Sequence, residues 1–486
     1  MSHTSPFSNY KFSPDLKDEV WERSDKVNES YKDVHRLFES MSISDFRKLN
    51  EYARLSFLNQ GITYAVYSEE NGGTEKIFPF DLFPRIISAK EWEYLEVGLK
   101  QRNMALNLFV KDIYNKKQIL KDKVVPEKLI LSSSHYCKLM EEISPKGGIY
   151  THICGTDLIK NVDGNFYVLE DNLRSPSGVS YVLSNRKALR RTLMDVFHNF
   201  KVKAVNEYPF ELCKVLESVA PSNAWAPTCV LLTPGLYNSA YYEHSFLAQT
   251  TGIELVEGRD LFVENNFVYM KTIKGRVKVD VIYRRIDDAF LDPDVFRPDS
   301  LLGVKGLMSA YKKNNVTIVN APGTGIADDK AVCSYVPDMI KYYLDEDPII
   351  KNVPTFLCER KKDLDHVLSN IKKMVIKPVD MSGGYGVEIC DTKSDAELEV
   401  IIAKIKADPR NFIAQPKMSL SVHSTYIDED KGFQPRHIDL RTYTLLGKDY
   451  QFTLGGGLSR VALKEGSLIV NSSQGGGSKD TWVIDA

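Results

Sequence analysis

Two neighbouring segments of the sequence carry oxygen-bearing side chains at a spacing that suits a bound cation. Asp157 lies in one apolar run, and Glu170 and Asn172 end the next. Asp163 and Gly164 stand between the runs and favour a tight turn, so the pattern predicts a β-hairpin. Side chains alternate along a strand, which places Glu170 and Asn172 on one face. Two carboxylates and an amide oxygen suit a hard metal ion, Mg²⁺ or alternatively Mn²⁺, that carries nucleotide phosphates.

The residues that follow the predicted hairpin add groups suited to phosphate. Arg174 supplies a cation, and residues 175–178 supply hydroxyl groups and a flexible backbone. The alternative is a hairpin whose polar side chains only face water, which is the usual situation for any single acidic residue. The combination favours a metal-nucleotide site with Arg174 beside the phosphates.

A bound triphosphate also needs fixed cations, and two lysines follow suitable patterns. Lys330 comes directly after a glycine-containing loop that opens a helix, and free N–H groups at a helix start bind anions. Lys377 ends an apolar strand and precedes a glycine-rich turn between two strands. Such a turn can be an ordinary hairpin, but the lysine before it favours a nucleotide lid. The predicted lid residues are Ser382, Gly383, Gly384 and Gly386.

The apolar strand that ends at Gln415 is a candidate for the hinge whose main chain contacts adenine. The predicted nucleotide contacts there are Gln415, Lys417 and Met418. An apolar strand followed by a proline is equally common as plain scaffold, so both interpretations stay open.

Composition places these motifs in a large enzyme-sized protein. The chain has 486 residues, enough for about three domains, with 43% hydrophobic and 26% charged residues. The formal net charge of -2 gives no basic field for nucleic acid. The 7 cysteines form no C-x-x-C pair, which disfavours a zinc site. With no apolar run of membrane-spanning length, we expect a cytoplasmic enzyme without nucleic-acid or membrane partners, in the form of a homo-oligomer.

The elements that position the motifs fall into four segments. The first mixes helical and strand patterns and suggests no role, and the second holds a long amphipathic helix and the metal hairpin. The third alternates apolar strands with helices, the pattern of a small parallel α/β unit. The fourth holds the lid and the remaining strands. The predicted boundaries are 1–85, 86–204, 205–320 and 321–486.

Two runs in the second segment have sequence patterns typical of helices. Ser88 followed by Glu91 is a capping-box pattern that starts the long helix. The run from Val182 to Phe200 is rich in arginine and lysine. We expect it to be a helix with a solvated basic face and an apolar underside.

The motifs and their order resemble the circularly permuted ATP-grasp type 2 family, which is distantly similar to glutathionylspermidine synthetase. In the ordinary ATP-grasp order the lysines, lid and arginine strands precede the metal ligands, whereas here Asp157, Glu170 and Asn172 come first. The resemblance extends from about Phe78 to Trp482. It is carried by segments 102–107, 170–174, 177–181, 280–285, 298–303 and 471–480.

This resemblance implies an α/β fold of the α+β type, a circularly permuted ATP-grasp domain with an inserted small parallel α/β pre-ATP-grasp-like domain. It implies a carboxylate–amine ligase in which ATP phosphorylates a substrate carboxylate, an amine displaces phosphate, and ADP is released. The acid and the amine could each be an amino acid, a peptide or, for the amine, a polyamine. A nucleotide-binding regulatory protein on the same fold and an ATP-dependent phosphotransferase stay open as alternatives.

The resemblance also implies roles for the late arginines. Arg441 and Arg460, together with Arg174, would contact the transferred phosphoryl group, because a guanidinium stays charged and matches phosphate oxygens. Each could instead be an ordinary ion pair. The candidate substrate contacts are Arg284, Arg285 and Asn471, with a charged strand end as the alternative for the two arginines.

Overall fold

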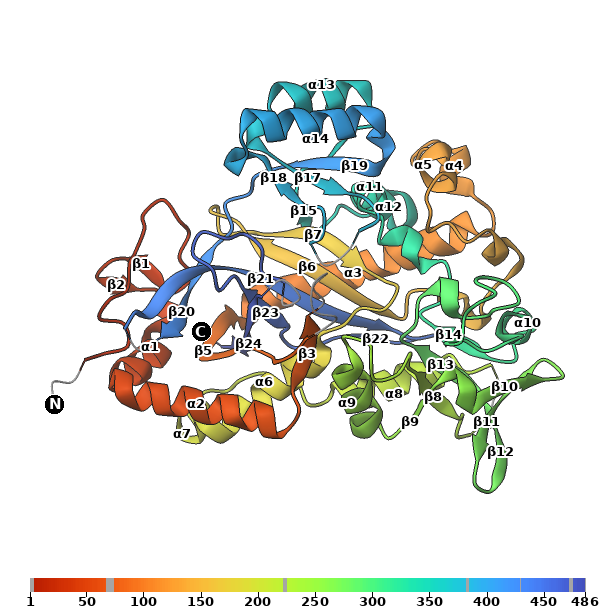
Figure 1. Ribbon diagram of the computed structural model, residues 1–486, viewed down its shortest axis with the longest axis horizontal. Helices are drawn as coiled ribbons and strands as arrows, with labels where there is room; N and C mark the ends of the chain where they lie inside the picture. Colours follow the sequence, from red (N-terminus) through yellow and green to blue (C-terminus); the bar gives the residue numbers. More distant parts are fainter. Residues whose placement is uncertain are drawn as a thin grey trace.

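The fold is organised around a nine-stranded mixed sheet at the centre of the molecule (Figure 1). A computed structural model describes residues 4–66, 74–221, 225–381, 384–428, 430–471 and 475–485. The strand order is β15-β7-β6-β21-β23-β24-β5, and β20 and β22 also pair with β21. The strands are β5 (Phe80–Ser88), β6 (Ile153–Lys160), β7 (Phe166–Asn172), β15 (Lys351–Asn352), β20 (Val422–Asp428), β21 (Gly432–Leu446), β22 (Gln451–Thr453), β23 (Leu458–Val461) and β24 (Gly477–Ile484).

Strands from both halves of the chain alternate in this sheet. β21 pairs antiparallel with β6, and β24 pairs in parallel with β5. The hairpin of β6 and β7, yellow in Figure 1, therefore lies beside the late strands β21 and β23, shown in blue. This arrangement brings the early acidic motif and the late arginine motif into one surface, as the permuted order requires.

The long helix α3 (Ala89–Ile113) packs against this sheet. Its Trp92, Leu95 and Leu99 form a buried cluster with residues of β6 and β7. The Ser88 hydroxyl accepts a hydrogen bond from the Glu91 N–H at 3.2 Å, which confirms the predicted N-cap. A capping box also requires the Glu91 carboxylate to accept from the Ser88 N–H. That part of the prediction was wrong, because the Glu91 carboxylate pairs with Lys160 at 2.8 Å.

The N-terminal segment packs on the outer end of the sheet. Its helices are α1 (Lys32–Glu39) and α2 (Ile43–Asn59), and its strands are β1 (Trp21–Arg23), β2 (Lys26–Val27), β3 (Thr63–Val66) and β4 (Thr74–Ile77). Aromatic residues from this segment, such as Phe7 and Phe38, share a core with Phe433 and Trp482. The segment therefore covers the late strands.

A second sheet, in the order β14-β13-β8-β9, is entirely parallel. Its strands are β8 (Cys229–Leu232), β9 (Glu254–Val256), β13 (Val281–Arg284) and β14 (Thr317–Val319), and its helices are α8 (Tyr208–Ser218), α9 (Tyr241–Thr251) and α10 (Leu307–Lys312). This parallel arrangement of strands between helices is the one that the sequence predicted for the segment. A three-stranded antiparallel sheet that was not predicted projects from it, with β10 (Leu261–Glu264), β11 (Phe267–Thr272) and β12 (Gly275–Val279). The domain boundaries themselves stay a prediction.

A four-stranded sheet, in the order β16-β19-β17-β18, lies above the hairpin and contains the predicted lid, whose name is kept for it below (Figure 1). Two helices cover its outer side, so its inner side faces the main sheet. The elements are β16 (Phe356–Leu357), α13 (Lys361–Ser369), β17 (Met374–Pro378), β18 (Glu388–Ile389), α14 (Asp395–Ala407) and β19 (Phe412–Pro416). The glycine-rich turn joins β17 to β18 as predicted, but Ser382 and Gly383 lie outside the described residues.

The remaining helices connect these units. They are α4 (Gln118–Lys121), α5 (Glu127–Leu131), α6 (Val179–Thr192), α7 (Met194–His198), α11 (Lys330–Cys333) and α12 (Val336–Leu344). The basic helical run was predicted as one element, but Leu193 has a non-helical backbone and divides it into α6 and α7.

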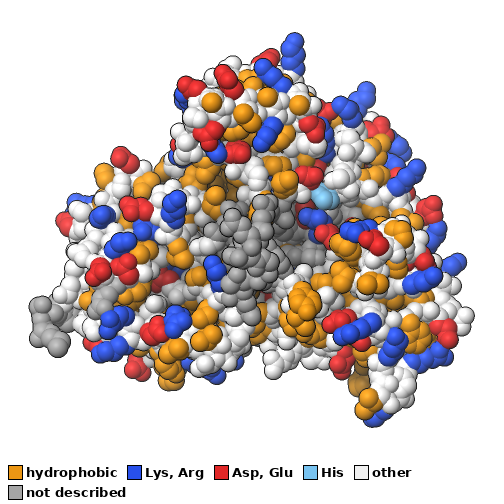
Figure 2. Space-filling model, viewed as in Figure 1, with side chains coloured by type: hydrophobic (Ala, Val, Ile, Leu, Met, Phe, Trp, Pro, Cys, Tyr) orange, Lys and Arg blue, Asp and Glu red, His pale blue; other side chains and the backbone are white. Residues whose placement is uncertain are grey.

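The surface carries both signs of charge. On the face shown in Figure 2, lysine and arginine side chains are interspersed with aspartate and glutamate, as expected for a net charge of -2. Among the helices that the structure describes, none combines the length and the apolar character needed to cross a bilayer.

Candidate active site

The predicted metal hairpin is formed by β6 and β7, with Asp157 opposite Glu170 and Gly155 opposite Asn172. The register shifts beside this pair, because Leu158 stands opposite Val168 and Leu169 is an extra residue. Strict alternation would have placed Val168 on the same face as Glu170. The bulge instead lets Val168 pack in the core at 1% exposure while Glu170 stays partly exposed.

The opposite face of the hairpin is anchored by a buried ion pair that the sequence analysis missed. Arg102 of α3 contacts the Asp171 carboxylate through Nε and Nη2, with distances of 2.9 and 2.7 Å. Thr156 also donates to Asp171, at 3.0 Å. Arg102 and Asp171 are 1% and 2% exposed. Asp171 lies between Glu170 and Asn172 in β7, so this ion pair ties the strand that carries both predicted ligands to α3.

Replacing Asp171 by alanine is expected to lower the free energy of unfolding by about 3–5 kcal/mol, since Arg102 would be left as an uncompensated buried charge. Urea titration of wild type and variant measures this difference. Asp299→Ala is the matched control, because its pair with Arg297 lies exposed on the surface and should contribute little. Equal stability of Asp171→Ala and wild type would contradict the anchoring role.

Asp157 is held by two arginines from neighbouring strands. Arg441 donates to it through Nε and Nη2 at 2.6 and 2.7 Å, and Arg460 donates through Nη2 at 2.8 Å. Burial alone would raise the pKa of Asp157, but the two guanidinium charges outweigh it and hold that pKa well below its usual value. Asp157 is therefore a carboxylate throughout the physiological pH range.

The two arginines differ in what they face. Arg460 is 5% exposed and its guanidinium is shared between Asp157 and Asp439, at 2.8 and 2.5 Å. Arg441 lines an open cleft, and it also approaches the Ser177 carbonyl at 3.4 Å. Arg460 thus positions Asp157 inside the sheet, and only Arg441 of this pair lines the cleft.

Lys330 lies across from the hairpin, with its Nζ 3.5 Å from the Glu170 carboxylate. It also donates to the carbonyl of Met381, next to the lid turn. The predicted anion site on free backbone N–H groups was wrong. The Asp329 side chain accepts from the N–H groups of Ala331 and Val332, so this one-turn helix is already capped. Lys330 can act only through its ammonium group.

Lys377 projects from β17 of the lid and is 9% exposed. Burial lowers its pKa to about 8, even though the charges of Glu170 and Asp157 oppose the effect. Its ammonium has no hydrogen bond or ion pair with any residue in the described part of the chain. A buried cation without a partner is costly, so this position suits an anionic ligand.

The affinity for a non-hydrolysable ATP analogue is expected to be constant below about pH 8 and to fall above it. Phosphate binds the protonated form of Lys377, so binding weakens once the free protein loses that proton at its pKa of about 8. Titration calorimetry across the neutral to alkaline range measures the profile. Lys377→Arg, which stays charged, should remove the decline; a decline of equal size in that variant would contradict the assignment.

The donors of the predicted metal set agree with a hard cation. Asp157 and Glu170 supply carboxylates, and Asn172 donates through Nδ2 to Gly155, which leaves its amide oxygen available. Within the described ranges, no group of three or more His, Cys, Asp or Glu side chains has metal-binding geometry. Asp157 would have to share its oxygens between the ion and the guanidinium groups of both Arg441 and Arg460. The set fits Mg²⁺ by chemistry, and its role as ligands stays a prediction.

A cleft of about 560 Å³ opens beside the hairpin and brings several predicted residues together. The described residues that line it include Asn172, Arg174, Arg285, Tyr385, Arg441 and Asn471. Arg174 pairs with Asp328 at 2.9 Å and Asp287 at 3.4 Å. Its stem lies so close to Gly325 that an added Cβ there would meet the Arg174 side chain at 2.7 Å. The glycine loop thus makes room for Arg174.

The adjacent residues Arg284 and Arg285 have different surroundings. Arg284 is fully buried and donates to the carbonyls of Asn320, Ile286 and Ala321. These bonds and the ion pair with Asp288 engage its guanidinium, and Arg284 does not line the cleft. The structure therefore does not place Arg284 where it was predicted to contact substrate. Arg285 faces the cleft, and its buried Nε has no hydrogen-bond partner among the described residues.

Glu243 of α9 positions Arg285 and was missed by the sequence analysis. One of its oxygens accepts from Arg285 Nη2 at 3.0 Å. The other accepts from the N–H groups of Gly178 and Ser180 at 2.6 and 3.1 Å. Gly178 has a φ of 112°, and an added Cβ would lie 2.5 Å from the Tyr443 hydroxyl. A single buried carboxylate therefore ties the parallel unit to the turn that walls the cleft.

The predicted adenine contacts lie at the end of β19 in the lid. Gln415 is buried and donates to Thr355 at 3.0 Å. Lys417 is exposed and pairs with Asp391 at 2.5 Å, and Met418 is half-buried. Gly384 and Gly386 have φ values of 76° and 71° in the turn that follows β17. Contacts of these five residues with nucleotide stay predictions.

The sequence matches a known family over most of its length. The model of the circularly permuted ATP-grasp type 2 family matches residues 84–462. An uncharacterized protein of Synechocystis sp. is 50% identical over 439 residues, which is 90% of each chain. An uncharacterized protein of Mycobacterium tuberculosis is 47% identical over 467 residues, which is 96% of this chain and 84% of its own.

More distant matches add a named relative and a solved structure. A protein of Frankia casuarinae with the provisional name glutamate–cysteine ligase 2-2 is 37% identical over 477 residues, 97% of this chain and 54% of its own. The structure of a glutathione synthetase-like effector from Globodera pallida, in its apo form, has a TM-score of 0.58 at 12% identity. It covers 90% of this chain and 96% of its own, which shows a shared fold. The chain belongs to the circularly permuted ATP-grasp type 2 family.

Proposed function

We propose that this protein is an ATP-dependent ligase that joins a carboxylate to an amine through an acyl phosphate and releases ADP and phosphate. Its family supports an ATP-dependent ligase in general. The observation that carries the finer proposal is the convergence of Lys330, Lys377 and Glu170 between lid and sheet, next to an arginine-lined cleft. This arrangement suits a triphosphate whose terminal phosphorus faces the cleft.

The charges of the site match the charges that the reaction moves. An oxygen of the substrate carboxylate attacks the γ-phosphorus, the bond to ADP breaks, and an acyl phosphate forms. The amine nitrogen then attacks the acyl carbon, the bond to phosphate breaks, and one proton leaves the amine. Lys330 and Lys377 would hold the nucleotide phosphates, and Arg441 and Arg174 would hold the transferred group from the cleft side.

Asp157, Glu170 and Asn172 would hold a divalent ion, Mg²⁺ or Mn²⁺, which neutralises phosphate charge and orients it when bound. Arg460 would act indirectly, because it fixes Asp157 between two guanidinium groups. The lid would exclude water, since water would hydrolyse an acyl phosphate before the amine could react.

Arg285 is the candidate contact for the substrate carboxylate. Glu243 and the Pro176 carbonyl orient its guanidinium, and its buried Nε has no partner among the described residues. It follows directly after the carboxyl end of β13, and ligands of parallel sheets bind at the carboxyl ends of the strands. Asn471 lines the same cleft and could contact the substrate or the phosphoryl group.

The first experiment is incubation of the purified protein with ATP, Mg²⁺ and pools of amino acids, small peptides and polyamines. Glutamate and cysteine belong in the pools because the Frankia relative carries a name for a ligase of that pair. We expect ADP, phosphate and a new mass equal to acid plus amine minus water. AMP would contradict the acyl-phosphate route. A stable phosphorylated product formed without an amine would indicate a phosphotransferase instead.

A further inference from the structure

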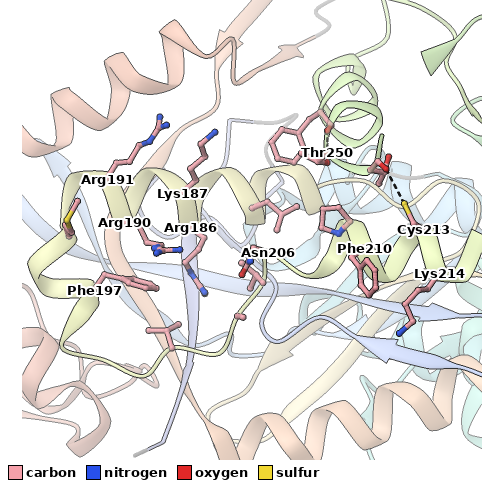
Figure 3. A pocket seen from close by; sticks show the side chains of 18 of the residues that line it. Arg186, Lys187, Arg190, Arg191, Phe197, Asn206, Phe210, Cys213, Lys214 and Thr250 are labelled. Atoms are coloured by element: carbon pink, nitrogen blue, oxygen red, sulfur yellow. Dashed lines mark hydrogen bonds between the residues drawn. The ribbon is translucent and has the colours of Figure 1, made fainter. Parts of the chain in front are cut away.

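A groove lined in part by helix α6 carries an excess of positive charge. Its volume is about 1190 Å³, larger than the cleft of the active site. Helices α6, α7, α8 and α9 supply its walls (Figure 3). The charged residues among those that line it are Arg186, Lys187, Arg190, Arg191, Lys214 and Glu217. Five basic side chains thus face one acidic side chain, in a protein whose formal net charge is -2.

Two of the five basic residues form ion pairs within the protein, and the other three have no ion-pair partner among the described residues. Arg186 is buried and paired with Asp480 at 2.7 Å, and Lys214 pairs with Glu211 at 2.9 Å. Lys187, Arg190 and Arg191 are exposed, and none of them forms an ion pair with a residue that the structure describes. Figure 3 shows these three spread along the helix α6. Lys187 and Arg191 lie one turn apart and point to the same side of this helix, whereas Arg190 points to the other side. Like charges one turn apart repel one another, so Lys187 and Arg191 suit an anionic partner.

The groove also presents apolar surface next to these cations. Phe210 on α8 is 66% exposed and Met194 on α7 is 57% exposed. Phe197 and Phe246 also line the groove, and the Arg190 guanidinium lies over the Phe197 ring at 5.2 Å. Exposed aromatic surface flanked by charge is typical of a site that binds another polypeptide.

We propose that this basic groove, defined by Lys187, Arg190, Arg191, Met194 and Phe210, binds an acidic amphipathic segment of a partner protein. Apolar side chains of the segment would lie against Met194 and Phe210, and its carboxylates would face Lys187 and Arg191 on one side of α6 and Arg190 on the other. The concave apolar floor favours a peptide over a flat membrane surface. The Frankia relatives match this chain over 54% and 55% of their own length, so in them such a unit is joined to further polypeptide.

The test uses a pool of fluorescein-labelled synthetic peptides of about five helical turns, with apolar residues on one face and glutamate or aspartate elsewhere. A second pool carries lysine in place of the acids. Fluorescence anisotropy with the full-length protein should show binding of the acidic pool only. We expect the double variant Arg190→Glu/Arg191→Glu to weaken binding by at least about tenfold, because both charges are reversed. Phe210→Ser should weaken it severalfold.

Lys361→Glu/Lys362→Glu on the lid helix α13 is the matched control, since it reverses two adjacent exposed cations elsewhere. It should bind the acidic pool as wild type does. Lys187→Gln provides a milder groove variant if the double variant does not fold. No binding of the acidic pool, equal binding of the lysine pool, or binding unchanged by the groove variants would overturn the proposal. So would groove-dependent binding of phosphatidylserine vesicles, RNA or a second copy of this chain in place of the peptides.

Discussion

Replacing Glu170 by glutamine is expected to lower the rate of ATP turnover by about 10²- to 10³-fold, the cost of removing one electrostatic contact to the reacting groups. Glu170 lies at the meeting point of hairpin, helix α11 and lid, opposite Asp157 and 3.5 Å from Lys330. The amide keeps the size of the side chain but loses the charge that would hold a divalent ion. Coupled measurement of ADP release gives the rate.

The loss should depend on the metal. With Mg²⁺ present, Glu170→Gln should bind an ATP analogue more weakly than wild type, whereas without Mg²⁺ it should bind at least as well, because a negative charge near the phosphates is gone. Glu91→Gln is the matched control: Glu91 is also partly exposed and also pairs with a lysine, Lys160 at 2.8 Å. Wild-type turnover in Glu170→Gln would remove Glu170 from the site.

Local patterns predicted the parts of the site that depend on neighbours in sequence. The hairpin follows from two apolar runs and an Asp-Gly turn, and the structure confirms it and places Glu170 opposite Asp157. The four parallel strands followed from short apolar runs between helices. The Ser88 cap is likewise a contact over three residues. Each of these signals is carried by a few consecutive residues.

Contacts between distant segments could not be read in this way. Nothing in the sequence near Asp157 indicates that Arg441 and Arg460, nearly at the other end of the chain, occupy its carboxylate. The capping of α11 by Asp329 is a contact within a few residues, so the sequence alone could have predicted it in place of an anion site. The bulge at Leu169 could not be predicted in this way, because it depends on how β7 pairs with β6.

Arg284 and Arg285 show why a predicted pair of residues can be half right. Side chains of consecutive strand residues point to opposite faces, so at most one of the two could face the cleft. The sequence does not say which, since both faces of a parallel strand are buried. In the structure, Arg284 donates to loop carbonyls and Arg285 faces the cleft. Glu243, which lies on helix α9, pairs with Arg285 and so orients it toward the cleft.

Replacing Lys377 by alanine is expected to raise the dissociation constant of an ATP analogue by about 10²-fold. Lys377 is a buried ammonium without a partner in the described part of the chain, and a charge-assisted contact to phosphate in such a place is worth about 1.5–3 kcal/mol. The free protein should not lose stability, because the substitution removes an ammonium that burial disfavours and that no described residue hydrogen-bonds. Lys373→Ala, an exposed lysine of the same lid, is the control and should bind as wild type does. Titration calorimetry measures the affinity and urea titration the stability. Unchanged affinity, or a loss of affinity that merely follows a loss of stability, would show that Lys377 does not contact the nucleotide.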